Sequence, residues 1–376
     1  MIEKLSIHNF KSLQDISLEL GRLNLFLGLN SMGKSSVIQS LLLLRQSYFK
    51  NSNLNTLCIN GELISLGGAK DIYYQNADMN GEISFAVRDT ASDIEAKYRY
   101  EDGTDILYES EISVIGAKLP EVSLFNSGFY YIAADHIAPS KTYNISNAGR
   151  NVYNRLGRNG ENAPYYLARH GAESLKNKAL HHDNSKSDTL AHELDAWMGE
   201  ISPGTRILSE ELPGIDLVKM SVQFKTRNKI APGQYTEEYT EKYSPVNVGF
   251  GIPYVFPLLL ILLISNPGDL VMIENPESHL HPRGQSELGR LMALAAQSGV
   301  QIICETHSDH VINGIRVAVK NQYVSNRDVR LFYFDKNRDT MLETEVTPIH
   351  VDRNGELDRY PQGLLDEWGN LMEQLI

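Results

Sequence analysis

The chain has 376 residues, of which 42% are hydrophobic and 22% charged, and its formal net charge is −12. This composition fits a globular protein with room for more than one lobe, and it argues against a disordered chain or a uniformly basic nucleic-acid-binding protein. Two isolated cysteines, Cys58 and Cys304, exclude a disulfide framework and a cysteine metal cluster. The most apolar run, residues 255–264, is too short to span a bilayer, so we expect a cytoplasmic protein without membrane contact.

The first part of the chain predicts a loop-and-helix unit followed by β-rich sequence. The opening 50 residues read as strand, turn, strand, glycine-rich loop and helix. Alternating polar and apolar residues, separated by Asn-Gly and Asp-Gly turn signals, then predict antiparallel strands at 82–87, 96–100 and 111–115. Residues 129–134 resemble a core strand. We therefore expect a first domain at 1–135 that contains half of a nucleotide-binding fold and an antiparallel β lobe.

The middle of the chain follows a different pattern. Residues 161–200 are polar and mostly helical in pattern, and an antiparallel strand pair is expected near 218–225 and 237–243. These features predict an inserted, mostly helical lobe at 136–235.

From Pro253 the chain alternates between helix and strand. Three apolar segments are predicted to be strands, at 270–273, 300–304 and 329–334. Such an alternation indicates a buried parallel sheet in a third domain, 236–376. No a/d heptad pattern is sustained over several turns, so long coiled-coil arms are not expected.

The segment GLNSMGKSS, from Gly28 to Ser36, fits the pattern G-x-x-x-x-G-K-[ST]. It lies between an apolar strand and an apolar helix, which is the context of a phosphate-binding loop. Backbone N–H groups of such a loop surround a phosphate, and the helix adds the positive end of its dipole. Lys34 is expected to reach the β- and γ-phosphates, and Ser35 to ligate Mg²⁺. The predicted nucleotide contacts in this loop are Asn30, Ser31, Met32, Gly33, Lys34, Ser35 and Ser36.

A phosphate loop also needs an acidic group that holds Mg²⁺ and its water, normally at the end of a neighbouring apolar strand. Strand 270–273 leads to Glu274, which we assign to the metal together with Ser35. The next strand leads to Glu305-Thr306-His307-Ser308, where a histidine can reach the γ-phosphate. A lone His307 would more often be structural, but beside these motifs we predict catalytic roles for Lys34, Glu274 and His307.

These motifs carry a family resemblance. IENPESHLHP and ETHSDHVINGIR resemble the C-terminal half of ABC-type ATPases of the SMC, RecF and OLD group, and residues 1–44 are similar to its N-terminal half. The tail from Asp352 resembles the end of the DUF3696 subfamily. The resemblance implies an α/β fold, an ABC-type P-loop NTPase head with a mixed or parallel core sheet, an antiparallel β lobe and an inserted helical lobe. It also implies ATP and Mg²⁺ as cofactors.

By the same resemblance, residues 244–252 (SPVNVGFGI) lie where ABC ATPases carry their signature motif. In that family the loop packs on the γ-phosphate held by a second subunit. Asn247, Gly249 and Gly251 are then expected to complete the site in trans, in a homodimer or larger homo-oligomer joined by nucleotide. A plain helix start after two glycines is the other interpretation.

One position departs from the family pattern. The residue after the metal-holding acid is usually a glutamate that polarises the attacking water, and here it is Asn275, which cannot take a proton. Either Glu277 acts as the base, or hydrolysis is slow and the protein is mainly a nucleotide-dependent clamp; Glu305 is a third candidate base. We predict slow hydrolysis assisted by Glu277.

Two histidine clusters invite a metal interpretation. His279 and His281 lie beside Glu277, and His181-His182 lie near His170 and His192. Neither spacing fits a standard zinc pattern, so we assign no metal to either cluster.

The resemblance implies an ATPase that drives a DNA-related, antiphage defence module through a separate effector protein. The alternatives are a RecF-like DNA-binding repair clamp and a nucleotide-sensing scaffold with little turnover, which Asn275 would favour. Residues 139–190 contain eight Lys or Arg and four Asp or Glu, so this segment is the candidate contact for nucleic acid.

Overall fold

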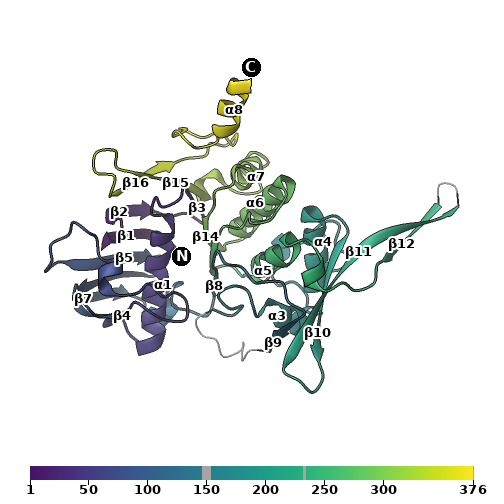
Figure 1. The fold of residues 1–376 in the computed structure, drawn as a ribbon, viewed down its shortest axis with the longest axis horizontal. Helices are drawn as coiled ribbons and strands as arrows, with labels where there is room; N and C mark the ends of the chain where they lie inside the picture. The colour runs from purple at the N-terminus through teal and green to yellow at the C-terminus, as the bar shows by residue number, and fades with distance from the viewer. Residues whose placement is uncertain (146–153, 232–233, 376) are drawn as a thin grey trace.

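The structure is a computed structural model that describes residues 1–145, 154–231 and 234–375. Its strands form three sheets (Figure 1). A central sheet separates an antiparallel sheet with its covering helix α1 (Lys34–Asn51) from a second group of helices and the inserted lobe. This arrangement confirms the predicted α/β fold with a mixed core sheet.

The central sheet has the strand order β16-β15-β3-β14-β13-β8. Five of these strands run parallel, and only β16 pairs antiparallel, with β15. Both faces of the sheet are covered, which explains why its strands read as continuous apolar runs in the sequence. The strands are β3 (Leu23–Leu27), β8 (Phe129–Ile132), β13 (Leu270–Glu274), β14 (Gln301–Glu305), β15 (Val329–Lys336) and β16 (Thr344–Ile349).

Successive residues of β3 belong to two hydrophobic cores, because side chains alternate across a strand. Leu25 and Leu27 pack into the core shared with the helices that follow residue 250. Phe26 packs into the opposite core, shared with α1 and the antiparallel sheet. The helices of the first core are α5 (Gly251–Ile264), α6 (Pro282–Gln297) and α7 (Asp309–Lys320).

The antiparallel sheet has the strand order β2-β1-β5-β6-β7-β4. Every neighbouring pair runs antiparallel, and its middle strands alternate buried and exposed residues, as in a sheet with one face on the core. The predicted β lobe is therefore present. Its elements are β1 (Ile2–Phe10), β2 (Leu13–Glu19), β4 (Thr56–Cys58), α2 (Ala69–Ile72), β5 (Glu82–Asp89), β6 (Ser92–Arg99), β7 (Ile106–Gly116) and η1 (Leu119–Glu121).

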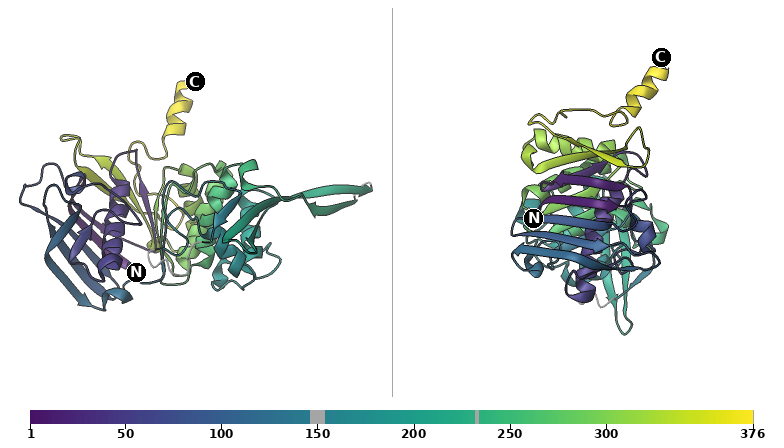
Figure 2. Two further views of the ribbon diagram at one scale, coloured as in Figure 1. Left: turned by 60° about the horizontal axis from the view of Figure 1, so that its bottom comes forward. Right: turned by 90° about the vertical axis from the view of Figure 1, so that its left-hand side faces the viewer.

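The inserted lobe differs from the prediction of a mostly helical segment. It contains α3 (Ala163–His170), η3 (Lys178–Leu180) and α4 (Leu190–Ile201), and also a sheet of four strands. The long strand β11 pairs with the three others, and its hairpin with β12 projects far from the rest of the molecule (Figures 1 and 2). The strands are β9 (Thr142–Asn144), β10 (Thr205–Leu212), β11 (Leu217–Ala231) and β12 (Gln234–Tyr239).

Several basic side chains of the segment 139–190 pair within the chain. Arg169 contacts Glu211 at 2.9 Å, and Arg158 lies 3.6 Å from Asp135. Ion pairs of this kind reduce the positive charge that the segment can offer to a nucleic acid.

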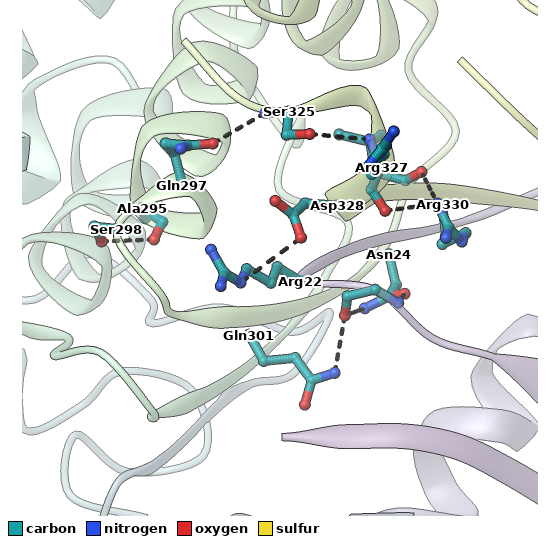
Figure 3. A network of polar contacts seen from close by, with 12 residues as sticks. Arg22, Asn24, Ala295, Gln297, Ser298, Gln301, Ser325, Arg327, Asp328 and Arg330 are labelled. Carbon is teal, nitrogen blue, oxygen red and sulfur yellow. Dashed lines mark hydrogen bonds and ion pairs between the residues drawn. The ribbon is translucent and has the colours of Figure 1, made fainter. Parts of the chain in front are cut away.

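The amino ends of the central strands are fixed by a polar network (Figure 3). The Asn24 side chain donates to the carbonyl oxygens of Gly21 and Ile302, at 2.9 and 3.0 Å. Gln301 donates to Gly21 O at 2.9 Å, and Arg22 lies 3.7 Å from Asp328. These contacts set the register of β3 against β14 and β15, and hence which residues meet at the opposite, carboxyl ends.

The remaining elements are η4 (Pro245–Asn247), η5 (Asn326–Asp328) and α8 (Glu367–Leu375). Helix α8 extends away from the body (Figure 2). In the described ranges, no helix has the length and apolar character needed to cross a membrane.

Candidate functional site

The predicted phosphate loop connects the end of β3 to the start of α1. Gly28 has φ +127° and Gly33 has φ +99°, both in the region that favours glycine. A Cβ at Gly28 would lie 2.2 Å from the backbone oxygen of Phe334, and one at Gly33 would lie 2.5 Å from the Thr344 hydroxyl. The two glycines of the motif are therefore required by conformation and by space.

Two residues outside the motif support this loop. The Thr344 hydroxyl donates to the carbonyl oxygen of Met32 at 3.0 Å and lies 2.8 Å from the Ser12 hydroxyl. The backbone N–H of Thr344 donates to Ser12 O at 2.9 Å. Sequence reasoning assigned neither residue to the site. Asn30 and Ser31, at the tip of the loop, are exposed.

Lys34 is buried at the start of α1, with 2% of its side chain exposed. Its ammonium donates to the carbonyl oxygens of Gly28 and Leu29, at 2.9 and 2.7 Å, and lies 3.9 Å from Glu305 Oε1. Burial lowers the pKa of Lys34, and the carboxylates of Glu305 and Glu277 oppose that change. The lysine is thus a partly desolvated cation directed at its own loop.

Ser35 contacts the end of the strand next to β3. Its hydroxyl donates to Glu305 Oε1 at 3.0 Å. Burial raises the pKa of Glu305, while Ser35 and Lys34 act in the opposite direction. The second carboxylate oxygen, Oε2, is buried and has no hydrogen-bond partner within the part of the chain that the structure describes.

Glu274 ends β13 and is the register partner of Glu305 on the parallel strand β14. Its Oε1 accepts a hydrogen bond from the Tyr131 hydroxyl at 2.9 Å. Burial, together with the nearby charge of Glu305, raises the pKa of Glu274 to about 7. Two carboxylates and the Ser35 hydroxyl therefore gather beside the phosphate loop.

This set of oxygens fits a magnesium ion that accompanies a phosphate. Mg²⁺ prefers hard oxygen ligands and is usually held by one or two carboxylates while phosphate and water supply the other positions. The buried, unpartnered oxygen of Glu305 is the kind of atom that a cation would satisfy. Among the described residues, no group of three or more His, Cys, Asp or Glu is arranged to hold a metal ion without such help.

Glu277 links the loops that follow β13 and β14. Thr306 donates to its Oε2 at 2.6 Å, and the backbone N–H of His307 donates to its Oε1 at 2.9 Å. Partial burial and the charge of Lys34 lower the pKa of His307. The charge of Glu277 and a hydrogen bond to the Gly28 backbone act in the opposite direction but are outweighed. The imidazole therefore lies close to the phosphate loop, with its backbone held by Glu277.

Asn275 has the left-handed backbone conformation, with φ +48°. Its N–H donates to the carbonyl oxygen of Glu305 at 2.9 Å, which joins the ends of β13 and β14. Its Oδ1 is buried and, among the described residues, has no hydrogen-bond partner.

Of the residues predicted to act in trans, Asn247 and Gly249 lie between β12 and α5, and Gly251 is the first residue of α5. Asn247 and Gly249 are exposed, and a Cβ at Gly251 would lie 2.5 Å from the carbonyl oxygen of His279. The rings of Phe250 and Tyr254 lie 5.9 and 4.8 Å from that of His279. Within the described ranges, no hydrogen bond or ion pair joins this segment to residues 28–36 of the same chain.

The other histidines have structural partners. His281 Nδ1 accepts from the N–H of Arg283 at 3.3 Å and so caps α6. The fully buried Glu193 accepts from His181 Nδ1 at 2.5 Å and from the N–H of His182 at 2.9 Å. These contacts give His281, His181 and His182 partners within the protein.

Comparisons with known sequences match most of the chain. A model described as an AAA ATPase domain matches residues 1–196. An AAA domain model, whose description refers to the AbiEii toxin of a type IV toxin–antitoxin system, matches residues 173–313, and the DUF3696 model, a protein family of unknown function, matches residues 324–375. No curated protein matches this chain in sequence.

Solved structures with a similar fold include SMC head domains. An SMC head bound to the C-terminal winged-helix domain of ScpA has a TM-score of 0.50 at 12% identity, over 93% of this chain and 98% of that one. The SMC head of Pyrococcus furiosus, with an extended coiled coil and the C-terminal domain of ScpA, has a TM-score of 0.50 at 11% identity, over 100% and 99% of the two chains. The fold is that of an ABC-type ATPase head, and the chain belongs to the AAA ATPase domain family.

Proposed function

We propose that this chain binds ATP with Mg²⁺ at residues 28–36 and hydrolyses it slowly. One observation carries the proposal: Lys34 and Ser35, at the start of α1, contact Glu305 at the end of β14, and Glu274 ends the neighbouring parallel strand β13. Membership of an ATPase family supports the same conclusion.

Different residues of the site would bind the phosphates, the metal ion and the nucleoside. Backbone N–H groups of the loop and the start of α1 would hold the phosphates, with Lys34 on the β- and γ-phosphates. Ser35, with the carboxylates of Glu274 and Glu305, would hold Mg²⁺, which neutralises charge on the transferred phosphoryl group. A cavity of about 590 Å³ would offer room for the ribose and base. Its lining includes Lys11, Tyr73, Tyr100, Lys336 and Ser12, and Ser12 contacts the Thr344 side chain that bonds the loop.

Slow turnover follows from the groups near the expected attacking water. Asn275 cannot accept a proton, and both oxygens of Glu277 accept hydrogen bonds from Thr306 and His307. We propose that Glu277 assists by holding His307 toward the γ-phosphate, and that no strong general base is present. The same observation favours a second candidate function, a nucleotide-sensing scaffold that binds and releases ATP with little hydrolysis.

We also propose that two copies share each nucleotide. Asn247, Gly249 and Gly251 would contact the γ-phosphate bound by the partner, and exposure of Asn247, Gly249 and Phe250 supports this role, since 59% of Phe250 is accessible in the single chain. Closure on ATP and opening after hydrolysis would give the protein two states. Such a switch would drive a DNA-related defence module through a separate effector protein.

The site is tested by ATP binding and turnover in wild type and Lys34→Ala. Wild type should bind ATP–Mg²⁺ and release phosphate slowly, and Lys34→Ala should lose both properties while keeping its thermal stability. Binding without any phosphate release above background would favour the scaffold. Equal ATP binding by wild type and Lys34→Ala would refute the assignment of the phosphate loop.

A further inference from the structure

Glu305 has contacts that its neighbour Glu274 lacks. The Ser35 hydroxyl, whose oxygen is the expected metal ligand, donates to Glu305 Oε1 at 3.0 Å. The strand order explains this choice, because β14 lies between β3 and β13. The carboxylate nearest to the phosphate loop is therefore the one at the end of β14, whereas Glu274 lies one strand further away.

The second carboxylate oxygen of Glu305, Oε2, is buried and lacks a hydrogen-bond partner among the described residues. Only 6% of Glu305 is exposed. The nearest cation, Lys34, lies 3.9 Å from Oε1, and its ammonium already donates to two carbonyl oxygens. A buried carboxylate oxygen without a partner is unfavourable, so its retention calls for a ligand that arrives from outside.

Glu274 is engaged differently. Its Oε1 accepts from the Tyr131 hydroxyl at 2.9 Å, on the side of β8. His136 contacts the backbone carbonyl of Glu274 at 2.9 Å. These contacts hold Glu274 toward the far edge of the sheet, away from Ser35.

We propose that Glu305, together with Ser35, is the principal protein carboxylate for the divalent cation that accompanies the triphosphate. Glu305 accepts a hydrogen bond from the Ser35 hydroxyl through Oε1 and offers Oε2 to the cation or to its water, and Glu274 serves as an outer carboxylate. The inference rests on the proposed function, because the cation arrives with the nucleotide. It also gives Glu305 a binding role in place of the role of general base.

The test measures the affinity of the full chain for the non-hydrolysable analogue AMP-PNP by calorimetry, once in Mg²⁺ and once in EDTA. Wild type should bind more tightly in Mg²⁺. Glu305→Gln keeps the shape of the side chain and should bind at least as well as wild type in EDTA, while the gain from Mg²⁺ falls at least tenfold. Glu274→Gln should lose less of that gain. Glu356→Gln is the matched control. Glu356 is exposed and pairs with Arg316, so this variant should behave as wild type.

Ser35→Ala provides a second line of evidence. If Ser35 and Glu305 act on one cation, the double variant should lose less of the Mg²⁺ gain than the sum of the two single losses, because coupled groups are not additive. Thermal melting establishes that each variant is folded. If Glu305→Gln does not fold, Glu305→Asp replaces it, and its shorter carboxylate should also weaken the response to Mg²⁺.

Three results decide between the claims. Wild type that binds no AMP-PNP in either buffer overturns both the proposed function and this inference. Wild type that binds, with a full Mg²⁺ gain in Glu305→Gln, overturns this inference alone. A larger loss in Glu274→Gln than in Glu305→Gln likewise returns the principal role to Glu274.

Discussion

The buried carboxyl group of Glu274 should make the stability of the nucleotide-free protein depend on pH. Its pKa is raised from 4.5 to about 7 in the folded chain, by burial and by the charge of Glu305. A raised pKa means that the folded state binds the proton more tightly than the unfolded state does. Stability therefore falls as the pH rises between these two values, and the full penalty is present above pH 7.

The size of this effect follows from the two pKa values. A change from 4.5 to about 7 corresponds to about 3 kcal/mol at high pH. Glu274→Gln keeps an oxygen for the Tyr131 hydroxyl and never ionises. Its free energy of unfolding should match that of wild type at pH 4.5 and exceed it at pH 8 by up to about 3 kcal/mol.

The assay is urea unfolding of both proteins without nucleotide or metal, from pH 4.5 to pH 8. Other groups titrate in both proteins, so the difference between them isolates Glu274. Two curves that stay parallel over this range would refute the claim that burial and the charge of Glu305 raise the pKa of Glu274.

The other predictions concern the loop and its support. Gly28→Ala should destabilise the protein by about 1–3 kcal/mol or more, because φ at Gly28 is +127° and the new Cβ would lie 2.2 Å from a backbone oxygen. Gly199→Ala is the control: no atom lies within 4 Å of its Cβ, so it should not destabilise the protein. Urea unfolding measures both variants. Thr344→Val removes the hydroxyl that holds Met32 O and should cost about 1–2 kcal/mol and weaken ATP binding, measured by unfolding and calorimetry. Glu277→Gln places an amide opposite the donors Thr306 and His307, so phosphate release should slow while AMP-PNP affinity stays unchanged; unaltered turnover would remove Glu277 from the reaction.

The glycine loop between β3 and α1 and the central strands could be predicted because their signals are local. Gly28, Gly33 and Lys34 stand in a fixed pattern, and the buried strands 270–273, 300–304 and 329–334 appear as apolar runs between polar turns. The same local logic located the strands of the antiparallel lobe.

What the sequence did not reveal depends on contacts between distant residues. Thr344 lies far along the chain from Met32 and Ser12, and no local pattern marks it. The partner of Ser35 depends on β14 lying next to β3, and strand order is not written in any one segment. The inserted lobe was predicted to be mostly helical with one strand pair, near 218–225 and 237–243. Strands β9 and β10 were not predicted, because they find their partner β11 only in the folded sheet.

The most direct test of the shared ATP site is the mass of the chain in solution, measured by light scattering with and without ATP–Mg²⁺. We expect wild type to change from a 42.2 kDa monomer to about twice that mass or more when ATP is added. Lys34→Ala should stay monomeric because it lacks ATP, and Asn247→Asp should stay monomeric although it binds ATP, because its new charge opposes the partner's γ-phosphate. A wild-type mass that ignores ATP, in a protein that binds it, would contradict the nucleotide-joined assembly.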